Sequence, residues 1–263
     1  MKRLGRKRLE SVLKQLNRTN PDTAGSRQGK RAFEMPPWQL MPAKYFGLFD
    51  DFMAVSGVTD LTQDDNFTAA GTSPAVTLDN AEVGGAVKIV AGTADDDVAR
   101  LFAVNCPFEL DASNARQVWM EARLKLSDVD ATGFFFGLAG VGTSGDDNVE
   151  TAILASTPSL ADGVGFQIVD GTAAETIATI TAVGDAETVT QSDVTLTDGT
   201  YVILSMYFDG STAHFYINGE LKLSTSSNLP TDGTNIAPHI EFIQQTGDSD
   251  SLHVDYVNYC MER

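Results

Sequence analysis

The sequence lacks several features that would place it in a common functional class. It has no run of about 18 apolar residues, so no membrane-spanning helix is expected. Its basic N-terminus lacks the apolar core of a secretory signal, which argues against export by that route. Its two cysteines, Cys106 and Cys260, are too few for a disulfide scaffold and do not form a zinc pattern. We expect two buried thiols, with a disulfide between them as the alternative.

Positive charge is scarce and unevenly distributed. The 263 residues include 18 Lys and Arg against 36 Asp and Glu, a formal net charge of −18. Eleven of the basic residues but only three of the acidic ones fall in residues 1–44, which gives this arm a charge of +8. Residues 45–263 therefore carry −26, and so acidic a chain argues against general nucleic-acid binding. The charge division predicts a basic arm, residues 1–44, and an acidic body, residues 45–263.

The basic arm has one short apolar pattern. Four apolar residues at i, i+3, i+4 and i+7 predict one stripe of a short amphipathic helix: Leu9, Val12, Leu13 and Leu16. Two adjacent prolines then favour an extended backbone before Trp38, which leaves that ring available for a partner. A helix of this length is marginal in water, so the arm is not expected to fold alone.

We predict that the arm docks on an acidic partner surface. Nucleic acid, an anionic membrane and an unattached solubilising tail are the alternatives. The predicted contacts are basic and apolar side chains: Arg3, Arg6, Lys7, Arg8, Leu9, Leu13, Leu16, Arg27, Lys30, Arg31 and Trp38.

The acidic body has the pattern of an all-β protein. Short apolar runs are separated by turn residues at a spacing of about 8–12 residues, which predicts a sandwich or barrel. No helix of ordinary length is evident, so a parallel sheet with crossover helices is disfavoured. The candidate strands are 45–53, 86–91, 98–104, 117–126, 133–139, 164–170, 176–183, 188–196, 201–208, 212–217, 221–224, 240–245 and 252–260.

Local patterns sharpen this prediction. Asp209-Gly210 and Asn218-Gly219 each separate two apolar runs, so residues 201–223 are predicted to form a three-stranded meander. Residues 119–126 alternate polar and apolar, as in a strand with one exposed face. The continuous run 134–136, three phenylalanines, predicts a strand buried on both faces.

Several of these segments resemble a known family. A strand that begins after Asp198-Gly199 and ends at Asp209-Gly210 is followed by the sequence Tyr-Ile-Asn-Gly at 216–219. Residues 45–263 thereby resemble the concanavalin A-like, or laminin-G-like, jelly roll, an antiparallel β-sandwich. Similar arrangements occur in decoration and cement proteins of tailed phages and in some tail fibres. The further segments that carry the resemblance are 119–125, 136–139, 229–230 and 254–257.

Catalytic patterns are incomplete. The resemblance includes glycosidases, and retaining hydrolysis needs two carboxyl groups about 5–5.5 Å apart. The nearest match, Glu109-Leu110-Asp111, lacks the second glutamate, and no Arg/His/Tyr cluster of the lyase type is apparent. The glycines from Gly140 to Gly145 fit a dinucleotide motif but have no helix after them, so they are read as a loop. We therefore predict no catalytic residues and no enzyme activity.

Metal binding is also not predicted. The three histidines have no ligand-like spacing, and His214 and His253 are expected to point to solvent in their strands. Acidic loops at 95–97, 146–148 and 248–250 offer oxygen ligands, so calcium remains the alternative to a protein without a cofactor.

These observations predict a non-enzymatic structural protein of a phage particle. The main hypothesis is a capsid decoration or cement protein, located in the virion, whose arm docks on the major capsid protein or another virion protein. A homo-oligomer is expected, and no membrane partner. The alternative is a glycan-binding tail-fibre or adhesin module that recognises a host surface, although the sequence identifies no sugar-binding residues. A glycoside hydrolase or lyase is the third reading.

Overall fold

The computed structural model describes most of the acidic body. The chain divides into two units, Met1–Glu34 and Met35–Arg263, and all described residues belong to the second. The basic arm, with every predicted docking residue, lies outside the described residues. The described residues are 45–50, 67–71, 75–79, 85–94, 96–103, 108–110, 116–129, 132–140, 160–168, 176–184, 186–231, 234–244 and 250–263.

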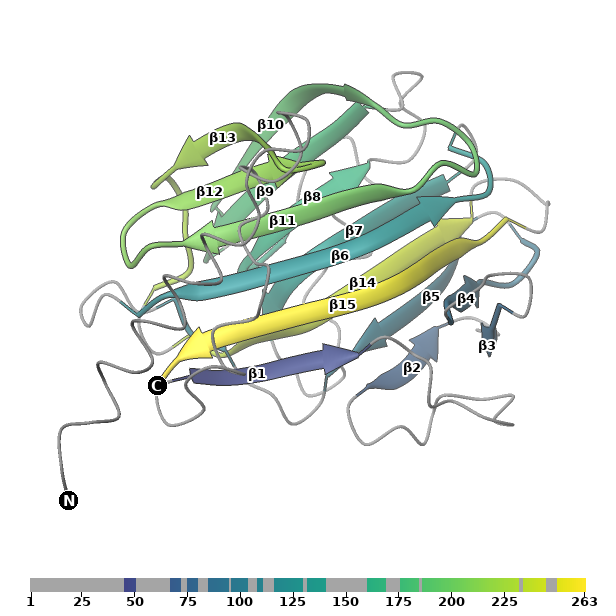
Figure 1. Ribbon diagram of the computed structural model, residues 1–263, viewed down its shortest axis with the longest axis horizontal. Coiled ribbons are helices and arrows are strands. Elements are labelled where there is room, and N and C mark those ends of the chain that lie inside the picture. Colours follow the sequence, from purple (N-terminus) through teal and green to yellow (C-terminus); the bar gives the residue numbers. More distant parts are fainter. Residues whose placement is uncertain are drawn as a thin grey trace, which may run out of the picture. The chain divides into compact units, whose positions relative to one another are not determined.

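The described strands form two antiparallel sheets that pack face to face (Figure 1). The eight-stranded sheet has the order β13 (Glu220–Thr225), β12 (Ala213–Ile217), β11 (Val202–Phe208), β6 (Val118–Leu126), β15 (Leu252–Glu262), β4 (Val87–Val90) and β3 (Ala75–Leu78), and β1 (Tyr45–Asp50) pairs farther along β15. The seven-stranded sheet has the order β10 (Ala186–Thr195), β9 (Thr176–Val183), β8 (Gly163–Ile168), β7 (Thr132–Gly140), β14 (Ile236–Gln244), β5 (Asp97–Phe102) and β2 (Thr68–Gly71). The predicted all-β sandwich is confirmed. The described residues contain no helix with the length and apolarity to cross a membrane.

The predicted meander is also confirmed, as β11, β12 and β13. Asn218 and Gly219 adopt φ of 51° and 77°, as a two-residue hairpin turn requires. At the preceding turn Gly210 has φ of 99°, and the Asp209 side chain accepts hydrogen bonds from the backbone of Ser211 and Thr212.

Three strand assignments differ from the prediction. β2 and β3 were not predicted, because four residues are too few to show a clear alternation. β14 begins at Ile236, four residues earlier than expected, and includes Pro238. The carbonyl of Pro238 faces β5, where it accepts a hydrogen bond from Ala103 N at 3.0 Å. The β14–β5 register begins one residue later, with the pair His239 and Phe102. The N–H that proline lacks would therefore lie beyond the end of this ladder, so its absence removes no hydrogen bond between β14 and β5.

The main core lies between the two sheets. It joins the buried side of β6, whose alternation is confirmed, to Phe134 and Phe136 of β7. Phe135 points the other way, into a second apolar cluster with Ile180 and Ile243. β7 is thus buried on both faces, as its sequence predicts. The outer face of the seven-stranded sheet therefore carries buried apolar side chains, whereas the outward-facing residues of a sandwich are usually polar.

Candidate functional site

A row of polar and aromatic side chains crosses the outer face of the seven-stranded sheet. In the strand registers Gln167 of β8 pairs with Phe135 of β7, Phe135 with Glu241 of β14, and Glu241 with Arg100 of β5. Direct partners in an antiparallel sheet have their side chains on the same face. Because Phe134 and Phe136 face the main core, this row faces away from the other sheet.

Glu241 is the centre of the row. Its Oε2 lies 2.8 Å from Nε2 of His239, two residues earlier on the same face, and 3.4 Å from Nε of Arg100. The side chains of Glu241, His239 and Arg100 are only 1%, 5% and 8% exposed. We call Arg100, Gln167, His239 and Glu241 the Glu241 cluster. Its fixed charges, one guanidinium and one carboxylate, offset each other.

Some polar atoms of the Glu241 cluster have no hydrogen-bond partner. Both amide atoms of Gln167, whose side chain is fully buried, and Oε1 of Glu241 are unbonded. Gln167 of β8 and Glu241 of β14 both belong to the row on this face. Leaving such a group unsatisfied costs about 1–3 kcal/mol, so native proteins rarely do it without a reason.

Aromatic rings border the cluster. The Phe102 ring stacks on His239 with centroids 6.1 Å apart, and the Phe135 ring meets His239 edge-on at 5.9 Å. Glycines keep the Phe135 ring low on the sheet, because a Cβ at Gly137 or Gly165 would lie 2.8 or 3.0 Å from ring carbons. Apolar rings beside a few polar groups are typical of small-molecule sites.

The outer face of the eight-stranded sheet is also aromatic, but its rings cover one another. Trp119 stacks on Tyr207 at 5.2 Å, Tyr207 stacks on His214 at 5.9 Å, and Tyr45 packs edge-on against Trp119 at 5.4 Å. Tyr207 therefore has a neighbouring ring on each side. This row stabilises the sheet and offers no open ring face of Tyr207 for a ligand.

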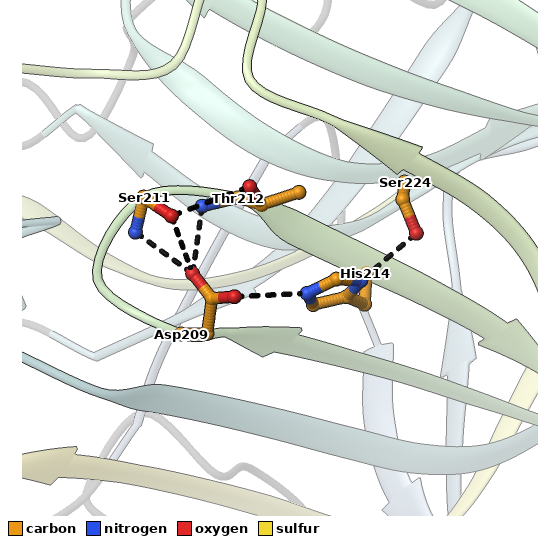
Figure 2. A network of polar contacts seen from close by, with 5 residues as sticks. All are labelled: Asp209, Ser211, Thr212, His214 and Ser224. Carbon is orange, nitrogen blue, oxygen red and sulfur yellow. Dashed lines mark hydrogen bonds and ion pairs between the residues drawn. The ribbon is translucent and has the colours of Figure 1, made fainter.

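At one end of that row lies a hydrogen-bond network around His214 (Figure 2). Asp209 Oδ1 accepts from Ser211 N, Ser211 Oγ and Thr212 N, each at 2.9 Å, and its Oδ2 lies 3.2 Å from His214 Nε2. His214 Nδ1 lies 2.8 Å from Ser224 Oγ. Burial alone would raise the pKa of Asp209, but the hydrogen bonds from Thr212, His214 and Ser211 lower it to about 2.

The His214 network contains the residue types of a nucleophilic triad, but a hairpin explains its geometry. Asp209 closes the turn between β11 and β12, and Ser224 is simply the cross-strand partner of His214 in β13. Ser224 lies on a regular strand and not in a tight turn that would present its oxygen to a substrate. We therefore assign this network a structural role.

The structure accounts for several residues singled out in the sequence. Glu109 pairs with Arg116 at 3.3 Å, whereas Asp111 lies outside the described residues. Gly140 ends β7, and the rest of the glycine motif is outside the described part. Arg100 and His239 both contact Glu241, but no tyrosine joins them among the described contacts, so the absence of a lyase-type Arg/His/Tyr cluster stays a prediction. Only strand pairing brings these distant positions together.

His253 corrects another prediction. Its side chain is 13% exposed and does not point freely to solvent, because Nδ1 bonds Asp79 at 2.6 Å and Nε2 bonds Ser251 at 3.0 Å. Burial lowers the pKa of His253 in spite of Asp79, and the neighbouring Lys125 and Lys88 lower it further. His214 is intermediate, with 24% of its side chain exposed.

The described residues test the metal and cysteine predictions only in part. No group of three or more His, Cys, Asp or Glu in the described ranges is arranged to hold a metal ion. Most residues of the three acidic loops lie outside those ranges, so calcium binding stays an alternative. Cys260 is buried, and Cys106 lies outside the described residues, so two buried thiols stay the prediction and a disulfide between them stays the alternative.

Comparison with known proteins identifies the fold. No protein-family model and no curated protein matches the sequence. A protein of unknown function from Shewanella oneidensis MR-1 is similar in structure, with 16% identity and a TM-score of 0.55 over 92% of this chain and 97% of its own. Peanut lectin has 10% identity and a TM-score of 0.56 over 83% of this chain and 97% of the lectin. The GH16 protein of the Bacteroides ovatus mixed linkage glucan PUL, in complex with a product, has 13% identity and a TM-score of 0.55 over 81% and 99% of the two chains. The body is therefore a concanavalin A-like jelly roll, as its sequence predicts.

Proposed function

We propose that the β-sandwich is a carbohydrate-binding module and that its ligand binds on the seven-stranded sheet, on the face that carries the Glu241 cluster. The observation that carries this proposal is the set of unbonded, buried polar atoms of Gln167 and Glu241 beside aromatic rings on one sheet face. Sugars present hydroxyl groups to such atoms and C–H groups to rings. Peanut lectin and the GH16 protein share the fold, which supports the same class of ligand.

Binding explains the cluster better than hydrolysis does. Retaining and inverting glycosidases both use a pair of carboxyl groups beside the scissile bond. Among the described residues the cluster contains one carboxylate, Glu241, and its Oε2 already faces His239 and Arg100. Incubation with polysaccharides is expected to release no shorter products.

A glycan array probed with the full-length chain tests the proposal. The substitution Gln167→Leu keeps the size of a side chain that makes no hydrogen bond in the free protein, so the fold is expected to survive while binding is lost. The matched control is Ser205→Ala, which changes a buried polar residue of the eight-stranded sheet. Absence of any bound glycan, or equal loss in both variants, would contradict the proposal.

The charge division favours a second, compatible function for the whole chain. We propose that residues 1–44 attach the acidic body to a virus capsid, as a decoration protein located in the virion. The +8 arm would contact the major capsid protein or another virion protein, and repetition over a symmetric shell would strengthen weak contacts. A homo-oligomer fits this proposal.

Deletion of residues 1–44 tests this attachment. Binding to purified capsids is expected to disappear, while glycan binding by the remaining chain is retained. Unchanged capsid occupancy would remove the docking role of the arm. Salt distinguishes the partner, because contacts to nucleic-acid phosphates weaken steeply with ionic strength, whereas anchoring by Trp38 and the leucines responds less.

A further inference from the structure

We infer that His253 is an acid-sensitive clasp, which holds the β3–β4 hairpin on the eight-stranded sheet when the ring is neutral and loosens it when the ring is protonated. This inference goes beyond the proposed sugar binding and involves none of its residues. Three features support it: the few contacts that attach the hairpin, the hydrogen bonds of the ring, and the charges beside it.

The β3–β4 hairpin has few attachments to its sheet. β3 is the last strand of the described sheet order, and β4 pairs with β15 at only three described positions, opposite residues 252–254. Asp79 follows β3, and its N donates to Ala86 O at 2.8 Å across the hairpin. Asp79 Oδ2 lies 2.6 Å from His253 Nδ1, so this bond connects β15 to the end of β3, past β4. A segment with few contacts opens more easily than the rest of a protein, so we expect the hairpin to depend on this bond.

The hydrogen bonds of His253 determine which nitrogen carries the proton. An ionised carboxylate only accepts, so Nδ1 donates its hydrogen to Asp79. Nε2 of the neutral ring then accepts from Ser251 Oγ at 3.0 Å. Acid adds a hydrogen to Nε2, and Ser251 must then accept there and can no longer donate. Because Ser251 is 2% exposed, its hydroxyl hydrogen loses this acceptor where water does not readily replace it.

Lysines lie on both sides of His253. In the strand registers His253 pairs with Lys88 of β4 on one side and with Lys125 of β6 on the other. Direct partners share one face of the sheet, and like charges placed opposite each other destabilise it. Asp79 is the opposing charge. Burial and the two lysines outweigh it, so the pKa of His253 lies below its ordinary value of 6.5.

Two further carboxylates lie within three residues of His253 along the chain, and both already have other donors. Asp255 forms an ion pair with Arg123. Asp250 Oδ2 accepts from the side-chain amide of Gln244 at 2.9 Å. We therefore expect Asp79 to be the main carboxylate that offsets a charge on His253.

The direction of the pH effect follows from the lowered pKa. The contribution of neutral His253 to stability is fully present above pH 6.5 and is lost progressively as the pH falls below that value. The expected loss concerns the hairpin first, because the bond to Asp79 is one of its few attachments. Mild acid should therefore open this edge of the sandwich while the central strands stay paired.

Hydrogen exchange of the full-length protein at pH 7.5 and pH 5.0 tests the inference. Exchange is resolved by mass spectrometry and corrected for the intrinsic effect of pH. We expect the protection of the β3 and β4 amides to fall about fivefold or more at the lower pH. The amides of β11 and β12, toward the other end of the same sheet, are expected to change less than about twofold.

Three variants identify the group responsible. His253→Gln keeps a hydrogen-bonding side chain that does not titrate, so the protection of the hairpin is expected to become nearly independent of pH. The matched control His214→Gln, on the same outer face, is expected to leave the response of the hairpin unchanged. Lys88→Gln removes one repelling charge and is expected to reduce the response about twofold.

Several outcomes would overturn the inference. Unchanged protection of β3 and β4 at pH 5.0 would do so, as would an equal loss in all strands or a response that persists in His253→Gln. An NMR titration of the His253 ring in the unsubstituted chain keeps the test valid if a variant does not fold. We expect its midpoint below pH 6.5, and a midpoint above that value would contradict the inferred clasp.

Discussion

The two outer faces of the sandwich differ in how fully their polar groups are hydrogen-bonded. On the eight-stranded sheet, Glu121 accepts from Ser205 at 2.9 Å and from Tyr256 at 2.7 Å, and the Asp209 carboxylate is saturated by its turn. On the seven-stranded sheet, Gln167 and one oxygen of Glu241 are buried without partners. Both faces belong to one sequence and one core. The first face thus satisfies its polar groups, whereas the second retains unsatisfied groups at some cost in stability, which is what the proposed binding function would explain.

The largest expected effect comes from removing the central carboxylate of each face. Glu241→Ala leaves Arg100 and His239 buried without their shared partner, and we expect a loss of about 3–5 kcal/mol in the free energy of unfolding. Glu121→Ala removes two hydrogen bonds at a half-buried site, and we expect a loss of about 1–2 kcal/mol. Urea denaturation at neutral pH measures both.

The corresponding glutamine variants provide the controls. Glu241→Gln keeps the shape and is expected to lose less stability than Glu241→Ala. If Glu121→Ala proves as damaging as Glu241→Ala, the two faces are energetically alike and the contrast drawn here is wrong.

A smaller effect, of opposite sign on the two faces, is expected from substituting Gln167 on the seven-stranded sheet and Ser205 on the eight-stranded sheet. Gln167→Leu replaces a buried amide that makes no hydrogen bond, so the free energy of unfolding should stay unchanged or rise by about 1 kcal/mol. Ser205→Ala removes a donor to Glu121 and should lower it by about 1 kcal/mol.

Thermal and urea midpoints of the two variants, measured without sugar, check this sign difference. A loss of stability in Gln167→Leu would show that the amide already has partners in the free protein. That result would remove the strongest reason to place a ligand on the seven-stranded sheet.

The smallest effect concerns pH and the turn of the His214 network. The folded pKa of Asp209, about 2, lies below its ordinary value of 3.8, so its contribution to stability is present above pH 3.8 and is lost as the pH falls toward 2. Asp209→Asn should therefore flatten the dependence of the urea midpoint on pH between these values. An unchanged pH dependence would mean that the carboxylate is not held as the structure indicates. No sugar affinity should change, because this turn lies on the other sheet.

Much of the fold follows from local sequence. Asp209-Gly210 and Asn218-Gly219 predict their hairpins because few residues other than glycine and asparagine tolerate the positive φ of tight turns. Alternation along β6 predicts its buried face, and the three phenylalanines of β7 predict burial on both sides. The start of β14 was not predicted, because Pro238 has no N–H and the sequence does not show which backbone N–H groups donate to a neighbouring strand.

The Glu241 cluster has no comparable local signal. His239 and Glu241 are two residues apart, which places them on one face of a strand, but the spacing of the three histidines predicts no metal site and gives no other local sign of the cluster. Arg100 and Gln167 belong to strands far away in the chain.

The sequence by itself determined the all-β body, its meander and the charge division between arm and body, because turn chemistry, alternation and composition act over a few residues. Only the tertiary structure decided which side chains share the outer face of the seven-stranded sheet. That choice depends on strand order and register, where a shift of one residue would send Gln167 and Glu241 to the opposite face.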